Sequence, residues 1–167
     1  LSTGIALQVI EAGDRIRQGL PAAQIAQEVS ALRQHCHASF ILDTLTFMKA
    51  GGRCSAVVAF GANLLNLKPC IEVDNTSGAM RVGKKYRGSL EKVLPQYVRD
   101  QLALYPKVKG DHLFITYSTI DPALIQLVRK TVQKTMSFKE IHITAASCTI
   151  ASHCGPNTLG ILFETED

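Results

Sequence analysis

His153 is the residue of this chain best suited to bind a ligand or take part in chemistry, and it lies near the C-terminal end. It stands in the segment Ser152-His153-Cys154-Gly155-Pro156, where Gly155-Pro156 is a turn signal between two predicted strands. A neutral imidazole has one donor and one acceptor nitrogen, and it can take up charge near neutral pH. These properties suit an anionic or carbonyl ligand. A histidine satisfied by its own loop is the simpler alternative, and this segment alone leaves both open.

The thiol of Cys154 adjoins His153 and suggests a second chemistry, that of a thiol nucleophile with its base. Neighbouring residues rarely aim at one point, and no second oxyanion donor is evident, so we do not expect an enzyme. The five cysteines form no Cys-x-x-Cys pair, which is typical of reduced thiols in a cytoplasmic protein. We also expect no metal site, because the adjacent residues His35-Cys36-His37 point in different directions.

Two arginines stand next to glycines and could meet an anion. Arg53 follows Gly51-Gly52, whose backbone N–H groups are free of side-chain cover, and Arg87 precedes Gly88. A guanidinium makes bidentate contacts with a phosphate or carboxylate that lysine cannot copy. Ordinary surface arginines beside a helix would give the same pattern, so both interpretations stay open.

Composition indicates one folded domain over residues 1–167. Hydrophobic residues make up 46% and charged residues 19% of the 167. The apolar runs are all shorter than the ~20 residues needed to cross a bilayer. The net charge of +4 is dispersed, and 6% aromatic residues with no Trp leave little for base stacking. We therefore expect neither a transmembrane segment nor a nucleic-acid partner.

Before Arg53, the sequence predicts two helices, a short strand and a third helix. Ile5, Val9, Ala12 and Ile16 form one stripe, and Ile25, Val29, Leu32 and Cys36 form another, so both helices should lie on a shared sheet. Residues 40–42 read as a buried strand, and residues 45–50 as a short helix. The next predicted helix, 56–65, is apolar almost all round, which predicts that Phe60 and Leu64 line an apolar cavity.

The remaining elements complete an α/β fold. Residues 68–74 and 79–86 read as a hairpin, and residues 90–105 as a helix in which Pro95 marks either a kink or the first turn. A strand at 113–115, a helix that begins at Asp121-Pro122, and two strands around His153 follow. The prediction is a two-layer domain with a mixed, largely antiparallel sheet of about six strands and helices mainly on one side.

Several segments resemble, in order, the motifs of the DegV family of bacterial fatty-acid-binding proteins. The run His153-Cys154-Gly155-Pro156 is similar to the family's His-Thr-Gly-Pro-Gly signature, although Cys154 and Asn157 depart from it. Residues 43–55, with Asp43-Thr44-Leu45 and Gly51-Gly52-Arg53, and residues 63–69 resemble the family's Asp-Thr-Leu, Gly-Gly-Arg-Ile-Ser and Leu-Leu-Asn-Ile-Lys-Pro block. Tyr86-Arg87-Gly88 is similar to the Val-Arg-Gly that follows there.

The resemblance implies a function. It implies a long-chain fatty acid in an apolar tunnel, with its carboxylate near His153 and Gly155, and no other cofactor. It implies that the lipid is presented to a separate fatty acid kinase that makes an acyl phosphate for phospholipid synthesis, with Arg53 and Arg87 at the docking surface. It also implies a cytoplasmic protein and a further N-terminal domain, which we expect to be absent from this chain. A structural or interaction domain without lipid, its cavity filled by its own side chains, is the alternative.

Overall fold

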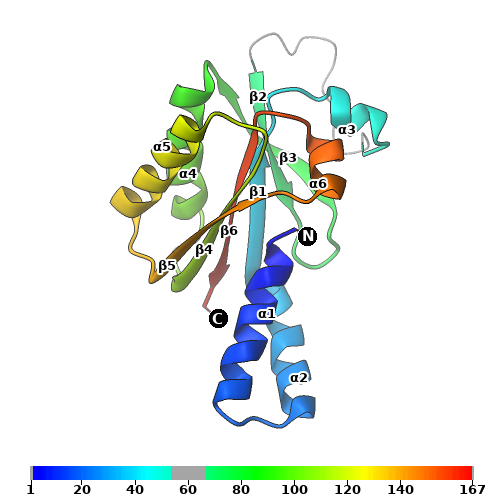
Figure 1. Ribbon diagram of the computed structural model, residues 1–167, viewed down its shortest axis with the longest axis vertical. Coiled ribbons are helices and arrows are strands. Elements are labelled where there is room, and N and C mark those ends of the chain that lie inside the picture. The colour runs from blue at the N-terminus through cyan, green and yellow to red at the C-terminus, as the bar shows by residue number, and fades with distance from the viewer. Residues whose placement is uncertain (1, 54–66, 167) are drawn as a thin grey trace.

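The computed structural model describes residues 2–53 and 67–166, and within them six strands form one sheet (Figure 1). The strand order is β3-β2-β1-β6-β4-β5. Strands β4 and β5 pair in parallel, and each other neighbouring pair is antiparallel. In chain order the strands are β1 (Cys36–Ile41), β2 (Leu67–Val73), β3 (Met80–Arg87), β4 (Val108–Ser118), β5 (Glu140–Ala145) and β6 (Thr158–Thr165). The expected mixed, largely antiparallel sheet is confirmed.

Two long helices, α4 (Leu90–Ala103) and α5 (Pro122–Thr135), cover one face of the sheet (Figure 1). Their apolar sides pack with alternate residues of β6 and β4 to form the main core, in which Leu94, Val128 and Ile161 are fully buried. The Asp121 side chain accepts a hydrogen bond from the N–H of Ala123 at 2.8 Å, as the Asp-Pro start signal predicts. Pro95 lies inside α4, after its first turn. Helices mainly on one side are thereby confirmed.

The opposite face carries less cover. Two short helices, α3 (Thr46–Ala50) and α6 (Cys148–Cys154), pack against each other over one part of it. The first turns of α1 (Gly4–Arg17) pack elsewhere on this face, where Leu7 meets Phe114 and Leu162. A smaller cluster around Met48 and Cys154 fills the space beneath α3 and α6. Because these covers are short, this face keeps room for a cavity.

The expectation that α1 and α2 (Ala22–Leu32) both lie on the sheet is wrong. The two helices form a hairpin that projects beyond the sheet (Figure 1), and α2 buries none of its residues. In the predicted stripe, Ile5 is 60% exposed and Val9 and Ile16 are each 65% exposed. The buried residues of α1 are Gly4, Leu7 and Glu11, one every three or four positions.

Polar contacts explain this rotation of α1. Lys109 of β4 forms an ion pair with Glu11, and Thr3 meets Thr116 at 2.6 Å between hydroxyls instead of capping the helix. Both contacts turn the face of α1 that carries Leu7 toward the sheet. Cys36, which we placed on the stripe of the second helix, belongs to β1, because α2 ends at Leu32.

The hydroxyl of Tyr97 joins α4 to the middle of the sheet. It donates to the carbonyl of Ser39 at 2.7 Å and accepts from the N–H of Ile161 at 3.0 Å, two residues that face each other across β1 and β6. A side chain at Gly160 would approach the carbonyl of Ser39 too closely, so glycine permits this local geometry. Tyr97 is fully buried, so its hydroxyl adds a polar link to the apolar packing that holds α4 on the sheet.

Among residues 2–53 and 67–166, none of the helices combines the length and the apolar character that a bilayer crossing requires.

Candidate ligand-binding site

A cavity of about 190 Å³ lies between the less covered face of the sheet and helices α3 and α6. Its floor is formed by Ala38 and Phe40 of β1 and by Leu162 of β6. Met48 and Ile150 contribute apolar walls from the two helices. The lining is mainly apolar, and Ser2, Ser39, Thr116, Ser118, Thr149 and Thr158 add hydroxyl groups, so the cavity suits an apolar ligand that carries a polar group.

His153 contributes its ring to the wall of this cavity. The expected connection between β5 and β6 carries it, and this connection contains a short helix, α6, that we did not predict from the sequence. Ser147 caps α6 by accepting a hydrogen bond from the N–H of Ile150 at 3.4 Å, and Gly155 ends it with φ +77°. A serine at one end and a glycine at the other were the available sequence signals for this helix.

The Nδ1 atom of His153 is buried, and no described residue forms a hydrogen bond with it. A buried polar atom without a partner costs about 1–3 kcal/mol, and this nitrogen lies against Gly51. A neutral imidazole carries its proton on one of its two nitrogens, and a proton on Nε2 makes that nitrogen a hydrogen-bond donor.

Two glycines allow α3 and α6 to approach closely. A methyl group at Gly51, the residue that ends α3, would lie 2.8 Å from Cε1 of the His153 ring and closer still to its Nδ1. A methyl group at Gly155 would collide with the ring of Phe47 on α3. Gly51 therefore sets the position of the imidazole, while Gly155 acts through helix packing and is absent from the cavity wall.

The structure separates the two predicted arginines. Arg53 lines the cavity beside His153, is exposed, and donates from Nη1 to the carbonyl of Gly51 at 2.9 Å. Arg87 is exposed at the end of β3 and is not part of the cavity wall. Phe60, Leu64 and the predicted helix 56–65 lie outside the described residues.

The hypothesis of a thiol nucleophile gains no support from the geometry. Burial raises the pKa of the Cys154 thiol to about 11, so the reactive thiolate is scarce at neutral pH. Cys154 packs in the apolar cluster with Met48, and no hydrogen bond joins it to His153 among the described residues. Cys154, which stands where the family signature has Thr, contributes to this cluster and to the cavity wall.

Asn157, the other departure from the family signature, has a structural role. Its backbone takes φ +59°, which Asn tolerates better than most residues, and its Nδ2 donates to Oδ2 of Asp43 at 3.1 Å. The other oxygen of Asp43 pairs with Lys68. These contacts tie the start of β6 to the ends of β1 and β2, so the turn after α6 is held in place.

Comparisons with known proteins agree with this architecture. A DegV domain-containing protein of Deinococcus radiodurans is 24% identical over 166 residues, which are 98% of this chain and 57% of that protein. The structure described as "Fatty Acid Binding of a DegV family Protein from Thermus thermophilus" has 25% identity and a TM-score of 0.83, and the match covers 98% of this chain and 57% of that one. The chain thus spans a little over half the length of these relatives.

A further structure has the same fold at lower identity. It is the Streptococcus pneumoniae Fatty Acid Kinase (Fak) B3 protein loaded with linoleic acid, with 20% identity, a TM-score of 0.80, and a match over 97% of this chain and 56% of that one. The sequence model described as "Uncharacterised protein, DegV family" matches residues 1–166. The motifs around His153 and Arg53, the sheet order and this match agree, and the chain belongs to the DegV family.

Proposed function

We propose that this chain binds a long-chain fatty acid, with the acyl chain in the apolar cavity and the carboxylate at His153. The position of His153 in the wall of a mainly apolar cavity carries the proposal. A carboxylate is costly to bury unless donors meet it, and Nε2–H of His153 with nearby hydroxyls can supply them. The relative from Thermus thermophilus, whose structure is described by its fatty acid binding, supports the same ligand class.

The size of the cavity bears on the design of the experiment. Its 190 Å³ is below the ~300 Å³ at which ligand pockets usually begin, so a long acyl chain requires it to widen or to extend beyond these residues. Each buried CH₂ contributes about 0.8 kcal/mol. Titration with saturated acids of increasing length should therefore show affinity rising steadily and then levelling where the apolar wall ends. Organic extraction and mass spectrometry of the purified protein should identify the lipid it carries.

The role of His153 is tested with matched ligands and variants. His153→Ala should weaken fatty-acid binding by about 1–3 kcal/mol, the loss expected when a polar group is left unpaired. A fatty alcohol of equal length should be affected much less, because it brings no carboxylate to the ring. Ser152→Ala, a neighbouring exposed position on α6, is the matched control and should bind as the parent does. Equal binding of the acid by His153→Ala and the parent would reject this site.

We also propose that the bound acid is presented to a fatty acid kinase, which phosphorylates the carboxylate for phospholipid synthesis in the cytoplasm. The kinship of fold with the Streptococcus pneumoniae protein supports this step. Arg87→Ala should leave lipid affinity nearly intact and slow phosphorylation of the bound acid by the partner kinase, and Arg53→Ala should slow phosphorylation as well. Arg129→Ala, exposed on α5, is the control. If lipid affinity and phosphorylation of the bound acid fall equally in the Arg53 variant, that arginine belongs to the lipid site.

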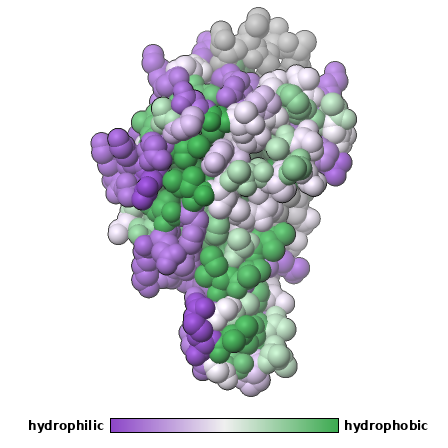
Figure 2. Space-filling view, viewed as in Figure 1, coloured by the Kyte–Doolittle hydropathy of each residue, from purple (hydrophilic) through white to green (hydrophobic). Residues whose placement is uncertain are grey.

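The relatives are longer than this chain. The exposed side of α1 is a candidate contact surface for the part of those proteins that this chain does not span. Ile5, Val9 and Ile16 are exposed along one side of α1, and Figure 2 shows apolar surface on the projecting hairpin. We propose that an N-terminal DegV domain covers them and completes the carboxylate site with its own hydroxyl donors. Joining such a domain should protect the amide hydrogens of α1 from exchange, whereas unchanged exchange would contradict the contact.

A structural domain without lipid is the competing proposal. Heating separates the two, because a ligand at 100 times its Kd should stabilise the fold by ~2.7 kcal/mol. An unfolding midpoint that does not move with added fatty acid would favour the structural domain.

A further inference from the structure

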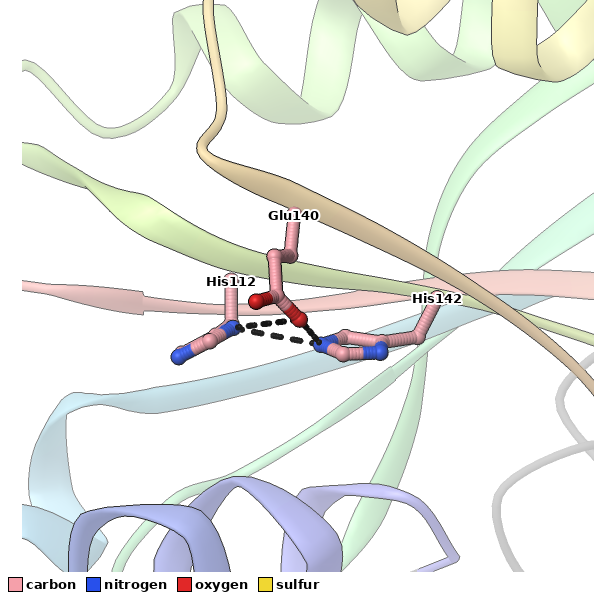
Figure 3. A group of neighbouring side chains, drawn as sticks. All are labelled: His112, Glu140 and His142. Carbon is pink, nitrogen blue, oxygen red and sulfur yellow. Dashed lines mark hydrogen bonds and ion pairs between the residues drawn. The ribbon is translucent and has the colours of Figure 1, made fainter. Parts of the chain in front are cut away.

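Three metal-ligating side chains meet at the other end of β4, away from the cavity. His112 of β4 lies opposite Glu140 of β5 in the parallel register, and His142 follows two residues later on β5. All three side chains lie on the face that carries α1, where His142 stacks on Phe114 at 4.5 Å between ring centroids. Figure 3 shows the two imidazoles and the carboxylate turned toward one another. The strand pairing thus places three ligand atoms together without any local sequence motif.

The distances fit a small divalent ion. Nδ1 of His112 is 3.1 Å from Nε2 of His142, and Oε2 of Glu140 is 3.5 Å from that Nε2 and 4.0 Å from that Nδ1. Zinc binds His nitrogen and carboxylate oxygen at about 2.0–2.2 Å, so in a tetrahedral site two ligand atoms lie ~3.3–3.5 Å apart. Small shifts of the two imidazoles and of the exposed Glu140 side chain would bring the three atoms to that spacing.

Access and charge also favour an ion. The two histidine side chains are 17% and 27% exposed, and that of Glu140 is 62% exposed, so the cluster opens to solvent and leaves room for a water as a fourth ligand. It lies in a groove with an excess of carboxylates: Glu11, Asp14, Glu28, Asp111 and Glu140 against Arg15, Arg17, Lys109 and Lys139.

The basic side chains closest to the cluster are held by acids. Lys139 pairs with Asp111 at 2.6 Å, and Lys109 pairs with Glu11. Neither ammonium group is therefore left to repel a cation at the two imidazoles.

We propose that His112, Glu140 and His142 form a binding site for a divalent transition metal ion of the zinc class, independent of the lipid site. Two imidazoles and one carboxylate with an open position is a ligand set that zinc accepts. The bound ion would replace the hydrogen bond between the imidazoles and would link the edge strand β5 to β4.

The test uses metal-stripped protein and zinc chloride alone. Titration calorimetry should show one zinc ion per chain, and the ion should raise the unfolding midpoint. His112→Ala and His142→Ala should each weaken zinc binding by at least about tenfold and remove that shift. Cobalt(II) as a second probe should give the visible absorption of a four-coordinate site in the parent, and this absorption should be lost in both variants.

Two controls exclude other sites. His35→Ala removes a histidine on the short 3₁₀ segment η1 (Arg33–His35), and Cys148→Ser removes an exposed thiol, so both should bind zinc as the parent does. If a histidine variant fails to fold, Glu140→Gln decides, because its side chain is largely exposed and its loss should still weaken binding. Absence of zinc binding, or equal binding in the parent and in Glu140→Gln, would show that the imidazoles are only a hydrogen-bonded pair.

Discussion

Gly51→Ala should displace the proposed carboxylate donor while leaving the fold intact. The backbone of Gly51 has φ −78° and ψ 3°, which alanine adopts without strain. The added methyl group would lie 2.8 Å from Cε1 of His153, whereas ordinary contacts between carbon atoms lie at about 3.5–4.0 Å. The imidazole must therefore move by roughly 1 Å, which is enough to spoil a hydrogen bond to a ligand oxygen.

The size of the effect follows from the interaction lost. A hydrogen bond to a charged group contributes about 1.5–3 kcal/mol, which corresponds to a Kd that rises about 10- to 150-fold. Stability should change much less, because the ring can rotate toward the cavity. Titration with a long-chain fatty acid measures the first quantity, and chemical unfolding measures the second.

Gly52→Ala is the matched control for this experiment. Gly52 has φ +70°, and a methyl group there would touch nothing within 4 Å. It should cost about 1–2 kcal/mol of stability through backbone strain and leave the Kd nearly unchanged. The two neighbouring variants should thus show opposite patterns. A folded Gly51→Ala protein with the parent's affinity would refute the reasoning that the position of His153 holds the carboxylate.

Three further predictions concern stability and the thiols. Tyr97→Phe should destabilise the fold by about 1–3 kcal/mol, measured by denaturant unfolding, because the buried carbonyl of Ser39 and N–H of Ile161 both lose their partner. Burial, and to a smaller extent the charge of His35, lowers the pKa of His37 to about 4. His37 therefore takes up a proton at a higher pH in the unfolded chain than in the folded one. Stability should fall as pH drops from ~6.5 to 4, and the slope should be shallower in His37→Gln. Thiol titration should find all five cysteines in denaturant without reductant, and a lower number would reveal a disulfide.

Local signals in the sequence were sufficient for most elements. Alternation predicted β5, the apolar run 159–163 predicted β6, the Asp121-Pro122 pair predicted the start of α5, and the four residues after Asp74 predicted the hairpin of β2 and β3. These features depend on neighbours in the chain, so periodicity and capping chemistry report them directly. The family could also be recognised, because its motifs are short runs of adjacent residues.

The sequence predicted one face of α1, and the structure buries another. The stripe of Ile5, Val9 and Ile16 is apolar enough to predict burial, yet Leu7 faces the sheet. Periodicity shows that a helix has an apolar side, but the sheet against which the helix packs decides which side is covered. Here the packing of Leu7 on the sheet and the ion pair between Glu11 and Lys109, 98 residues apart, hold the helix in its orientation.

The candidate sites show the same division between what the sequence indicates and what the tertiary structure adds. The residue types around His153 identified it as the candidate ligand contact from the sequence alone, and the same reasoning named Arg53 and Arg87 together. Only the tertiary structure put Arg53 in the cavity wall, put Arg87 elsewhere, and buried Nδ1 of His153 with no partner among residues 2–53 and 67–166. It also brought His112 to His142 across a parallel strand pair, which no spacing along the chain encodes. Residue chemistry is a local property that the sequence states, whereas distance between remote side chains is determined by strand register and helix packing.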